Sequence, residues 1–188
     1  MNTTQLDQAC SQYLHFRELF HCGETWQQTR CDNTPQQPAS WEAYATLAQG
    51  LLDPLWEQFG RPELTFGFCG ARLRQLILAN TSPRIAPKLD QHAAHELTRQ
   101  GQLVCPRGGA AIDFYYPGQN SHRIAQWLAQ HLPFDRLYLY GPQRPLHLSF
   151  SSSPAGQLIL LTEHQGRRIP RRLTRSQLDA MASQEPLC

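Results

Sequence analysis

The chain has 188 residues, 40% of them hydrophobic, which is enough for one domain with a buried core. Its formal net charge of +2 at pH 7 is too small to indicate a nucleic-acid or membrane-surface partner by itself. No stretch approaches the roughly eighteen apolar residues that a membrane span requires, and the N-terminal residues lack the basic and apolar regions of a signal peptide. The six cysteines form no CxxC pair, so we expect reduced thiols in a cytoplasmic protein.

Residues 1–60 are predicted to form helices that extend the N-terminus of the domain. Apolar residues recur near a helical period in 6–17, and a longer stripe follows the Pro/Gln-rich stretch NTPQQPAS. Ser40 is the predicted N-cap of the second helix and Gly60 its end. Pro54 predicts a kink or break near Leu52, because proline has no N–H to donate. The stripe consists of Trp41, Tyr44, Leu47, Ala48, Leu51, Leu52, Leu55 and Trp56.

From residue 61 the pattern changes to short strands and helices. Gly101 is predicted to close a helix and Ser121 to cap the next one. The last three strands are separated by Gly, Pro and Ser turns, which favours an antiparallel sheet over parallel strands with crossover helices. The sequence therefore predicts an α+β fold, with a small antiparallel sheet and flanking helices in residues 61–165 and the N-terminal helices packed on the same domain. The expected strands are 64–68, 110–116, 136–140, 145–150 and 157–161, and the expected helices are 71–79, 88–100 and 121–132.

Residues 166–188 are predicted to be a basic C-terminal tail. The segment from Arg167 to Arg175 carries five arginines and no acid. It is either an anion or nucleic-acid patch or a solvated tail, and the lack of interleaved aromatic residues favours the tail.

Two histidines and a glutamate lie close together in the expected helix 88–100. His92, His95 and Glu96 occupy positions i, i+3 and i+4, which project from one helix face and could converge on a metal ion. The zinc-binding HExxH helix uses the same residue types in another order. A charged, solvated helix face is the alternative.

Two expected strands carry further ligand candidates. Asp113 lies between Ile112 and Phe114, so strand alternation points it away from the face that these two share. A carboxylate among apolar residues is costly to bury unless it binds a cation or accepts several hydrogen bonds. His147 lies between two leucines and projects in the same alternating way. Each could be a structural residue, but two histidines and one aspartate on separate elements make the ligand set of a catalytic zinc site.

These segments resemble the zinc D-Ala-D-Ala carboxypeptidase superfamily, the M15-like peptidases, whose fold is shared with the hedgehog signalling domain. The family pattern is S-x-H-x-x-G-x-A-x-D, then a helix, a strand with FD, and a strand with W-x-H or H-x-H. DQH at 90–92 and GAAID at 109–113 are similar to the halves of the first motif, and PFDRLYLY at 133–140 and LHLSF at 146–150 to the two strands.

The resemblance covers residues 64–150 and leaves the N-terminal sixty outside. Carried over residue by residue, it implies His92, Asp113 and His147 as ligands of Zn²⁺. It also implies a hydrolase in which zinc-activated water attacks the amide bond of a peptide or another small amide.

The sequence departs from the family in three ways. Residues 93–108 lengthen the spacing between the two halves of the first motif. Residues 136–146 contain no acid, although the family's general base falls just before its last histidine. Cys69, in TFGFCG, takes the place of the family arginine that binds the substrate carboxylate.

Other residues are candidates for the missing roles. Glu96 could be the general base, with His95 as its partner or as a replacement ligand. Arg144 or Arg72 could bind the substrate anion. Asp135 is either a second base candidate or a structural cap in the FD motif.

Cys69 and Cys105 could approach the metal, or they could be small buried hydrophobic residues. The alternative for the whole chain is a catalytically divergent metal-binding or partner-binding domain, as in a phage or bacterial accessory protein, associated with nucleic acid through Arg167–Arg175.

Overall fold

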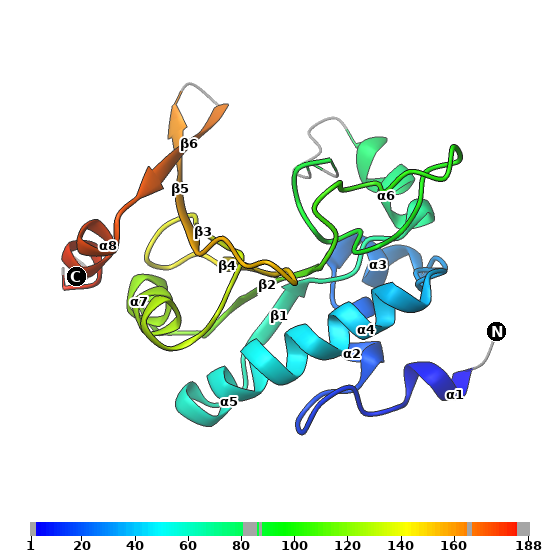
Figure 1. The fold of residues 1–188 in the computed structure, drawn as a ribbon, viewed down its shortest axis with the longest axis horizontal. Coiled ribbons are helices and arrows are strands. Elements are labelled where there is room, and N and C mark those ends of the chain that lie inside the picture. Colours follow the sequence, from blue (N-terminus) through cyan, green and yellow to red (C-terminus); the bar gives the residue numbers. More distant parts are fainter. Residues whose placement is uncertain (1–2, 81–85, 87, 165–166, 184–188) are drawn as a thin grey trace.

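The structure, a computed structural model, describes residues 3–80, 86, 88–164 and 167–183. It is an α+β fold built on a six-stranded mixed sheet (Figure 1) with the strand order β1-β2-β4-β3-β5-β6. All neighbouring strands are antiparallel except β3 and β5, which are parallel. The strands are β1 (Glu63–Phe66), β2 (Ala110–Tyr115), β3 (Arg136–Leu139), β4 (Leu146–Phe150), β5 (Gln157–His164) and β6 (Arg167–Leu173).

The predicted antiparallel sheet is therefore wrong at one strand pair. The chain reverses between β3 and β4 and again between β4 and β5, so β5 runs in the direction of β3 and pairs with its free edge. Each reversal needs only a short turn, and the sequence pattern alone does not show which edge the fifth strand joins.

One face of the sheet is apolar and is covered by helices. Contacts join α4 (Pro38–Leu47) to β2 and β4, and α7 (Ser121–His131) to β3. Alternate strand residues such as Ile112, Leu137 and Leu148 are fully buried in this core. The remaining helices are α1 (Thr3–Leu6), α2 (Phe16–Phe20), α3 (Glu24–Thr29), the π-helix η1 (Ala48–Leu52), α5 (Asp53–Phe59), α6 (Ala71–Leu78) and α8 (Arg175–Ala182).

The kink predicted at Pro54 is accommodated by a π-helical turn. The elements α4, η1 and α5 follow one another without a break from residue 38 to 59. The wider turn precedes Pro54, where an N–H is missing. Gly60 ends the helix with φ 83°, as expected. The predicted caps are shifted: α4 begins at Pro38 rather than after Ser40, and Asn120 caps α7 in place of Ser121.

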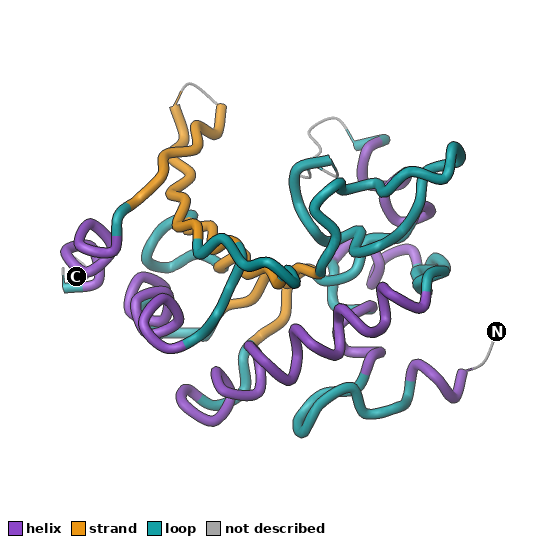
Figure 2. The backbone as a smooth tube through the Cα atoms, viewed as in Figure 1, coloured by secondary structure: helices purple, strands orange, loops and turns teal. Residues whose placement is uncertain are grey.

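The helix predicted at 88–100 does not form. Figure 2 shows this segment as loop, and Ala94 has φ 47°, which a helix does not allow. Polar groups of the segment bond instead to distant parts of the chain, and these tertiary contacts outweigh the helical spacing of its residues. His92 and Glu96 are the two examples described below.

The basic segment is part of the sheet rather than a tail. β6 pairs along its length with β5, and the hairpin extends away from the body in Figure 1. α8 packs on α7, where Gln126 Nε2 donates to Asp179 Oδ1 at 2.7 Å. Two regular elements therefore lie where the sequence predicted a solvated tail.

Asp135 fixes the connection between β4 and β5. Its fully buried carboxylate accepts two hydrogen bonds from Arg107, at 2.9 and 3.1 Å, and one from the Ala155 N–H at 2.9 Å. Burial opposes ionisation, but these donors outweigh it and lower the pKa of Asp135. The residue thus acts as a structural cap.

Replacement of Arg107 by Gln should lower the free energy of unfolding at pH 7, because the buried Asp135 carboxylate loses its cationic partner. The loss should be about 1–3 kcal/mol, since the Arg107 side chain is one-third exposed and solvent screens the pair. A carboxyl whose pKa is lower in the folded state stabilises the fold above its unfolded pKa of about 3.9, and this contribution is lost as the pH falls further. The difference from wild type should therefore shrink at pH 3 in urea titrations. Arg61→Gln, which breaks an exposed pair with Glu18, should cost less than about 1 kcal/mol; an equal cost would contradict the prediction.

Candidate metal centre

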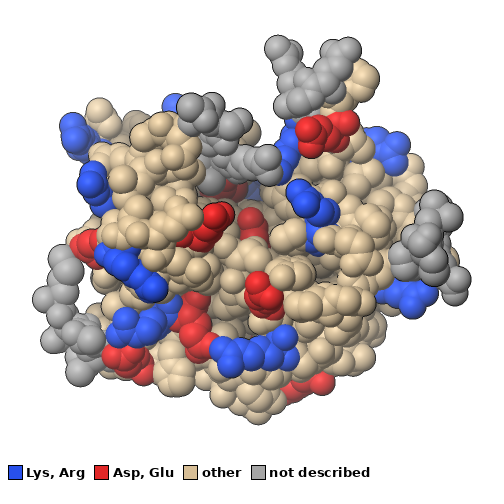
Figure 3. Space-filling model, turned by 180° about the vertical axis from the view of Figure 1, so that it is seen from behind, with Lys and Arg blue, Asp and Glu red and all other residues tan. Residues whose placement is uncertain are grey.

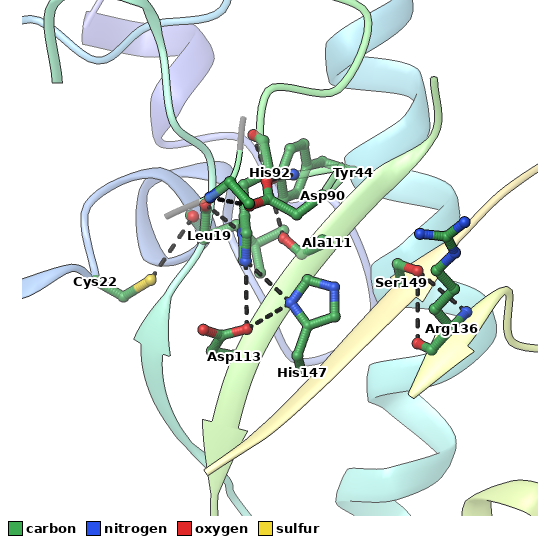
Figure 4. A network of polar contacts seen from close by, with 12 residues as sticks. Leu19, Cys22, Tyr44, Asp90, His92, Ala111, Asp113, Arg136, His147 and Ser149 are labelled. Atoms are coloured by element: carbon green, nitrogen blue, oxygen red, sulfur yellow. Dashed lines mark hydrogen bonds and ion pairs between the residues drawn. The ribbon is translucent and has the colours of Figure 1, made fainter. Parts of the chain in front are cut away.

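Two adjacent strands bring Asp113 and His147 together. The residues are direct partners in the antiparallel register of β2 and β4, so both side chains lie on the sheet face opposite the apolar core. His92 approaches them from the loop after α6, and Figure 4 shows the three side chains converging.

Three ligand atoms form a compact triangle. Asp113 Oδ1 lies 2.8 Å from His147 Nδ1 and 3.2 Å from His92 Nε2. The two nitrogens are 3.2 Å apart. Three ligands at zinc-bond lengths in tetrahedral geometry are about 3.3 Å from one another. The group therefore has the size of one metal coordination sphere, and a buried His92–Asp113–His147 cluster that can hold a metal ion is present in the protein.

The orientation of the His92 ring is fixed by a hydrogen bond at Nδ1, the nitrogen that faces away from the cluster. Its Nδ1 lies 2.9 Å from the carbonyl oxygen of Gly67, so Nδ1 carries a proton and Nε2 is the nitrogen that faces the cluster. Its carbonyl oxygen accepts the N–H of Cys69 at 2.9 Å, and the ring of Phe66 packs edge-on against the imidazole. His92 is thus presented as a ligand without help from a helix.

The cluster is closed on the histidine side and open at the carboxylate. His92 and His147 are 4% and 2% exposed, whereas the Asp113 side chain is 22% exposed. Burial disfavours the charged form of both His92 and Asp113, but their mutual attraction exceeds this cost. It raises the pKa of His92, and with the bond from His147 it holds the pKa of Asp113 far below its usual range. The site therefore keeps an anionic ligand available to a cation.

Two glycines directly before β2 allow the backbone there to pack closely against His95 and Phe150. Gly108 and Gly109 have φ 61° and 81°, a region that favours glycine. A Cβ at Gly109 would overlap the carbonyl oxygen of Phe150, and one at Gly108 would lie 2.7 Å from His95 Cε1. The N–H of Gly109 donates to His95 Nε2 at 3.1 Å. His95 therefore holds the glycine turn and is not a member of the three-ligand group.

Glu96 is committed to the start of α4. One oxygen, Oε1, accepts the N–H groups of Gln36 and Gln37 at 3.1 Å and the hydroxyl of Ser40 at 2.9 Å. These N–H groups have no partner within the helix, and a carboxylate at a helix N-terminus is also favoured by the helix dipole. The sequence pointed to a base, and the structure places Glu96 as a helix-capping side chain.

Among the described residues, the two cysteines and Arg72 are not members of the three-ligand group. Cys69 is buried in an apolar cluster with Leu73 and Ile77, and burial raises its pKa to about 12. Cys105 is fully buried, and burial raises the pKa of its thiol as well. Such thiols stay protonated at neutral pH and behave as small buried hydrophobic residues. Arg72 is exposed on α6.

A cavity of about 320 Å³ opens beside the cluster. It borders Asp113 and is lined by residues from five separate elements and the turn before β4. Arg144, one of the two arginines predicted to bind a substrate anion, is in that turn and lines the cavity. The other lining residues are Glu24, Thr25, Thr65, Phe66, Ile77, Tyr140, Pro145 and Arg168.

Several residues of the site gave no signal in the sequence. Gly67 positions His92 through its carbonyl group, and a Cβ there would overlap the carbonyl oxygen of Leu19. Tyr44 was expected only in an apolar stripe, yet its hydroxyl lies 2.9 Å from the carbonyl oxygen of Ala111 and 3.2 Å from that of His92. Contacts between backbone segments this distant leave no local pattern.

Comparisons with protein-family models, with curated proteins and with solved structures find no match. The resemblance to M15-like peptidases therefore stays a prediction from the quoted sequence motifs. Within the described ranges, no helix has the length and apolar character needed to cross a membrane.

Proposed function

We propose that the protein is a zinc-dependent hydrolase of the M15-like type, which cleaves an amide bond in a peptide or another small substrate. The observation that supports this most is the triangle of His92 Nε2, Asp113 Oδ1 and His147 Nδ1 beside a cavity. Catalytic zinc sites use three such protein ligands and leave a fourth position for water or substrate.

In this proposal the buried ligands would hold the zinc ion, and the exposed side of Asp113 would border the space for the substrate. A bound zinc ion would lower the pKa of water and polarise the scissile carbonyl group. Gly67 keeps His92 in the ligating tautomer, and the exposed edge of Asp113 faces the cavity where the substrate would lie. The buried histidines exclude solvent from the other side.

Glu24 is our candidate for the proton acceptor. It is in the first turn of α3 and lines the same cavity as Asp113, whereas Glu96 is held by three donors at the start of α4. Apart from Asp113, Glu24 is the acid among the residues described as lining this cavity. A carboxylate there can take a proton from attacking water and return it to the leaving amine.

The two glutamates can be separated by matched substitutions. Glu24→Gln should lower amide hydrolysis by about 10²–10⁴-fold with stability unchanged, because a positioned base contributes this much. Glu96→Gln keeps an acceptor oxygen but loses the charge at the helix start, so it should cost about 1 kcal/mol of stability and leave the rate per folded molecule unchanged. Initial rates and urea titrations of both variants provide the check. A stable Glu96→Gln protein without activity would return the base role to Glu96.

The function itself is tested by metal analysis and a substrate panel. The purified protein should contain zinc and release amine from some N-acyl dipeptides, and a chelator should stop the release. Iron in place of zinc would contradict the proposal, because two histidines and a carboxylate also bind iron in oxygenases. A zinc-loaded protein inactive on the whole panel would favour a metal-binding or partner-binding domain.

A further inference from the structure

Strand register places part of the basic segment on the face of the metal ligands. Direct partners across the sheet share a face, and the row Asp113, His147, Tyr138, Ile159 and Arg172 runs through four pairings from β2 to β6. Arg168 is four residues before Arg172 on the same strand, so it lies on this face too.

Arg171 is on the opposite face of β6. It pairs with Leu160 and is two residues before the buried Leu173. Arg168 and Arg172 therefore lie on one face of the hairpin and Arg171 lies on the other.

Two arginines from distant parts of the chain line the cavity beside Asp113. Arg144 comes from the turn before β4 and Arg168 from β6. Neither guanidinium group forms an ion pair or a side-chain hydrogen bond with another described residue. Arg168 is instead held over the ring of Tyr140, with 5.1 Å between Cζ and the ring centroid.

We infer that Arg144 and Arg168 form a subsite for an anionic group, a carboxylate or a phosphate, of a ligand that binds beside Asp113. Guanidinium groups bind both anions through paired N–H donors. The inference rests on the proposed function in one respect: the anion would belong to the substrate or product of the hydrolase.

The surroundings favour a small ligand over a polyanion. The cavity is about 320 Å³, which suits a ligand of a few residues, and Glu24 places a negative charge on its wall. On the face that Figure 3 shows, basic and acidic side chains are interspersed, whereas a nucleic-acid-binding surface presents a continuous basic area.

The test is a binding titration of the full chain in the presence of a chelator, so that its outcome does not depend on zinc. The probes are N-acetyl-Ala-Ala, its C-terminal amide, and inorganic phosphate. Binding of each probe is measured by NMR or calorimetry. The wild-type protein should bind the acid or phosphate at least about tenfold more tightly than the amide, the scale of one charge-assisted hydrogen bond. The tighter of the two anions identifies the ligand class.

Arg144→Gln and Arg168→Gln should each weaken anion binding about tenfold, and Arg171→Gln should change it less than about twofold. Equal binding of acid and amide, or an equal loss in Arg171→Gln, would overturn the subsite. So would an oligonucleotide that binds more tightly than both anions and is weakened alike by all three substitutions. Failure of amide hydrolysis with this binding intact would refute the proposed function and leave the subsite standing.

Discussion

His147→Ala and Asp113→Asn should each reduce bound zinc from about one ion per chain to nearly none, measured by elemental analysis after dialysis. Each change removes or weakens one of the three proposed protein ligands, so the affinity should fall by more than about a hundredfold. Asp113→Asn keeps the size of the side chain and removes only its charge. Loss in this variant therefore reports ligation and not packing.

His131→Ala is the matched control. This histidine is exposed on α7, and its Nδ1 bonds to the carbonyl oxygen of Trp127 on its own helix. Its replacement should leave the zinc content unchanged. Zinc retained at wild-type level by both His147→Ala and Asp113→Asn would show that the His–Asp–His cluster is not the metal site.

Gly109→Ala should lower the free energy of unfolding by about 4 kcal/mol or more. The residue combines a left-handed φ of 81° with a position where a Cβ would overlap the carbonyl oxygen of Phe150. Relief would require β2 to move away from β4 near Asp113 and His147. We therefore expect zinc affinity to fall together with stability.

Gly118→Ala separates the two causes. Gly118 has φ 77°, but no atom lies within 4 Å of a Cβ built there. This substitution should cost only about 1 kcal/mol, the strain of a non-glycine residue in that region. Urea titrations of both variants provide the comparison. Equal costs would mean that the backbone conformation alone, and not the close approach of Phe150, requires glycine at position 109.

Local pattern was sufficient for much of the sheet. Strands containing Asp113 and His147 were expected from alternation, because a side-chain period of two is set by the backbone itself. The α+β class and the C-terminal end of the helix at Gly60 followed in the same way from local chemistry. The parallel pairing of β3 with β5 did not, since it depends on which free edge a strand meets.

Helical spacing was misleading where tertiary hydrogen bonds compete with it. His92, His95 and Glu96 have helical spacing, yet each bonds to a different distant partner: Gly67, Gly109 and the start of α4. Spacing describes what an isolated segment prefers. It cannot weigh that preference against donors and acceptors that only the folded chain supplies.

The sequence by itself determined the candidate ligand types and the strands that carry two of them, because residue chemistry and strand alternation are local properties. Only the tertiary structure decided that Glu96 caps a helix, that Glu24 and Arg168 reach the cavity, and that Arg168 and Arg171 lie on opposite faces of a hairpin. The physical reason is the same in each case. These roles depend on contacts between residues that are distant along the chain, and such contacts leave no periodic trace in it.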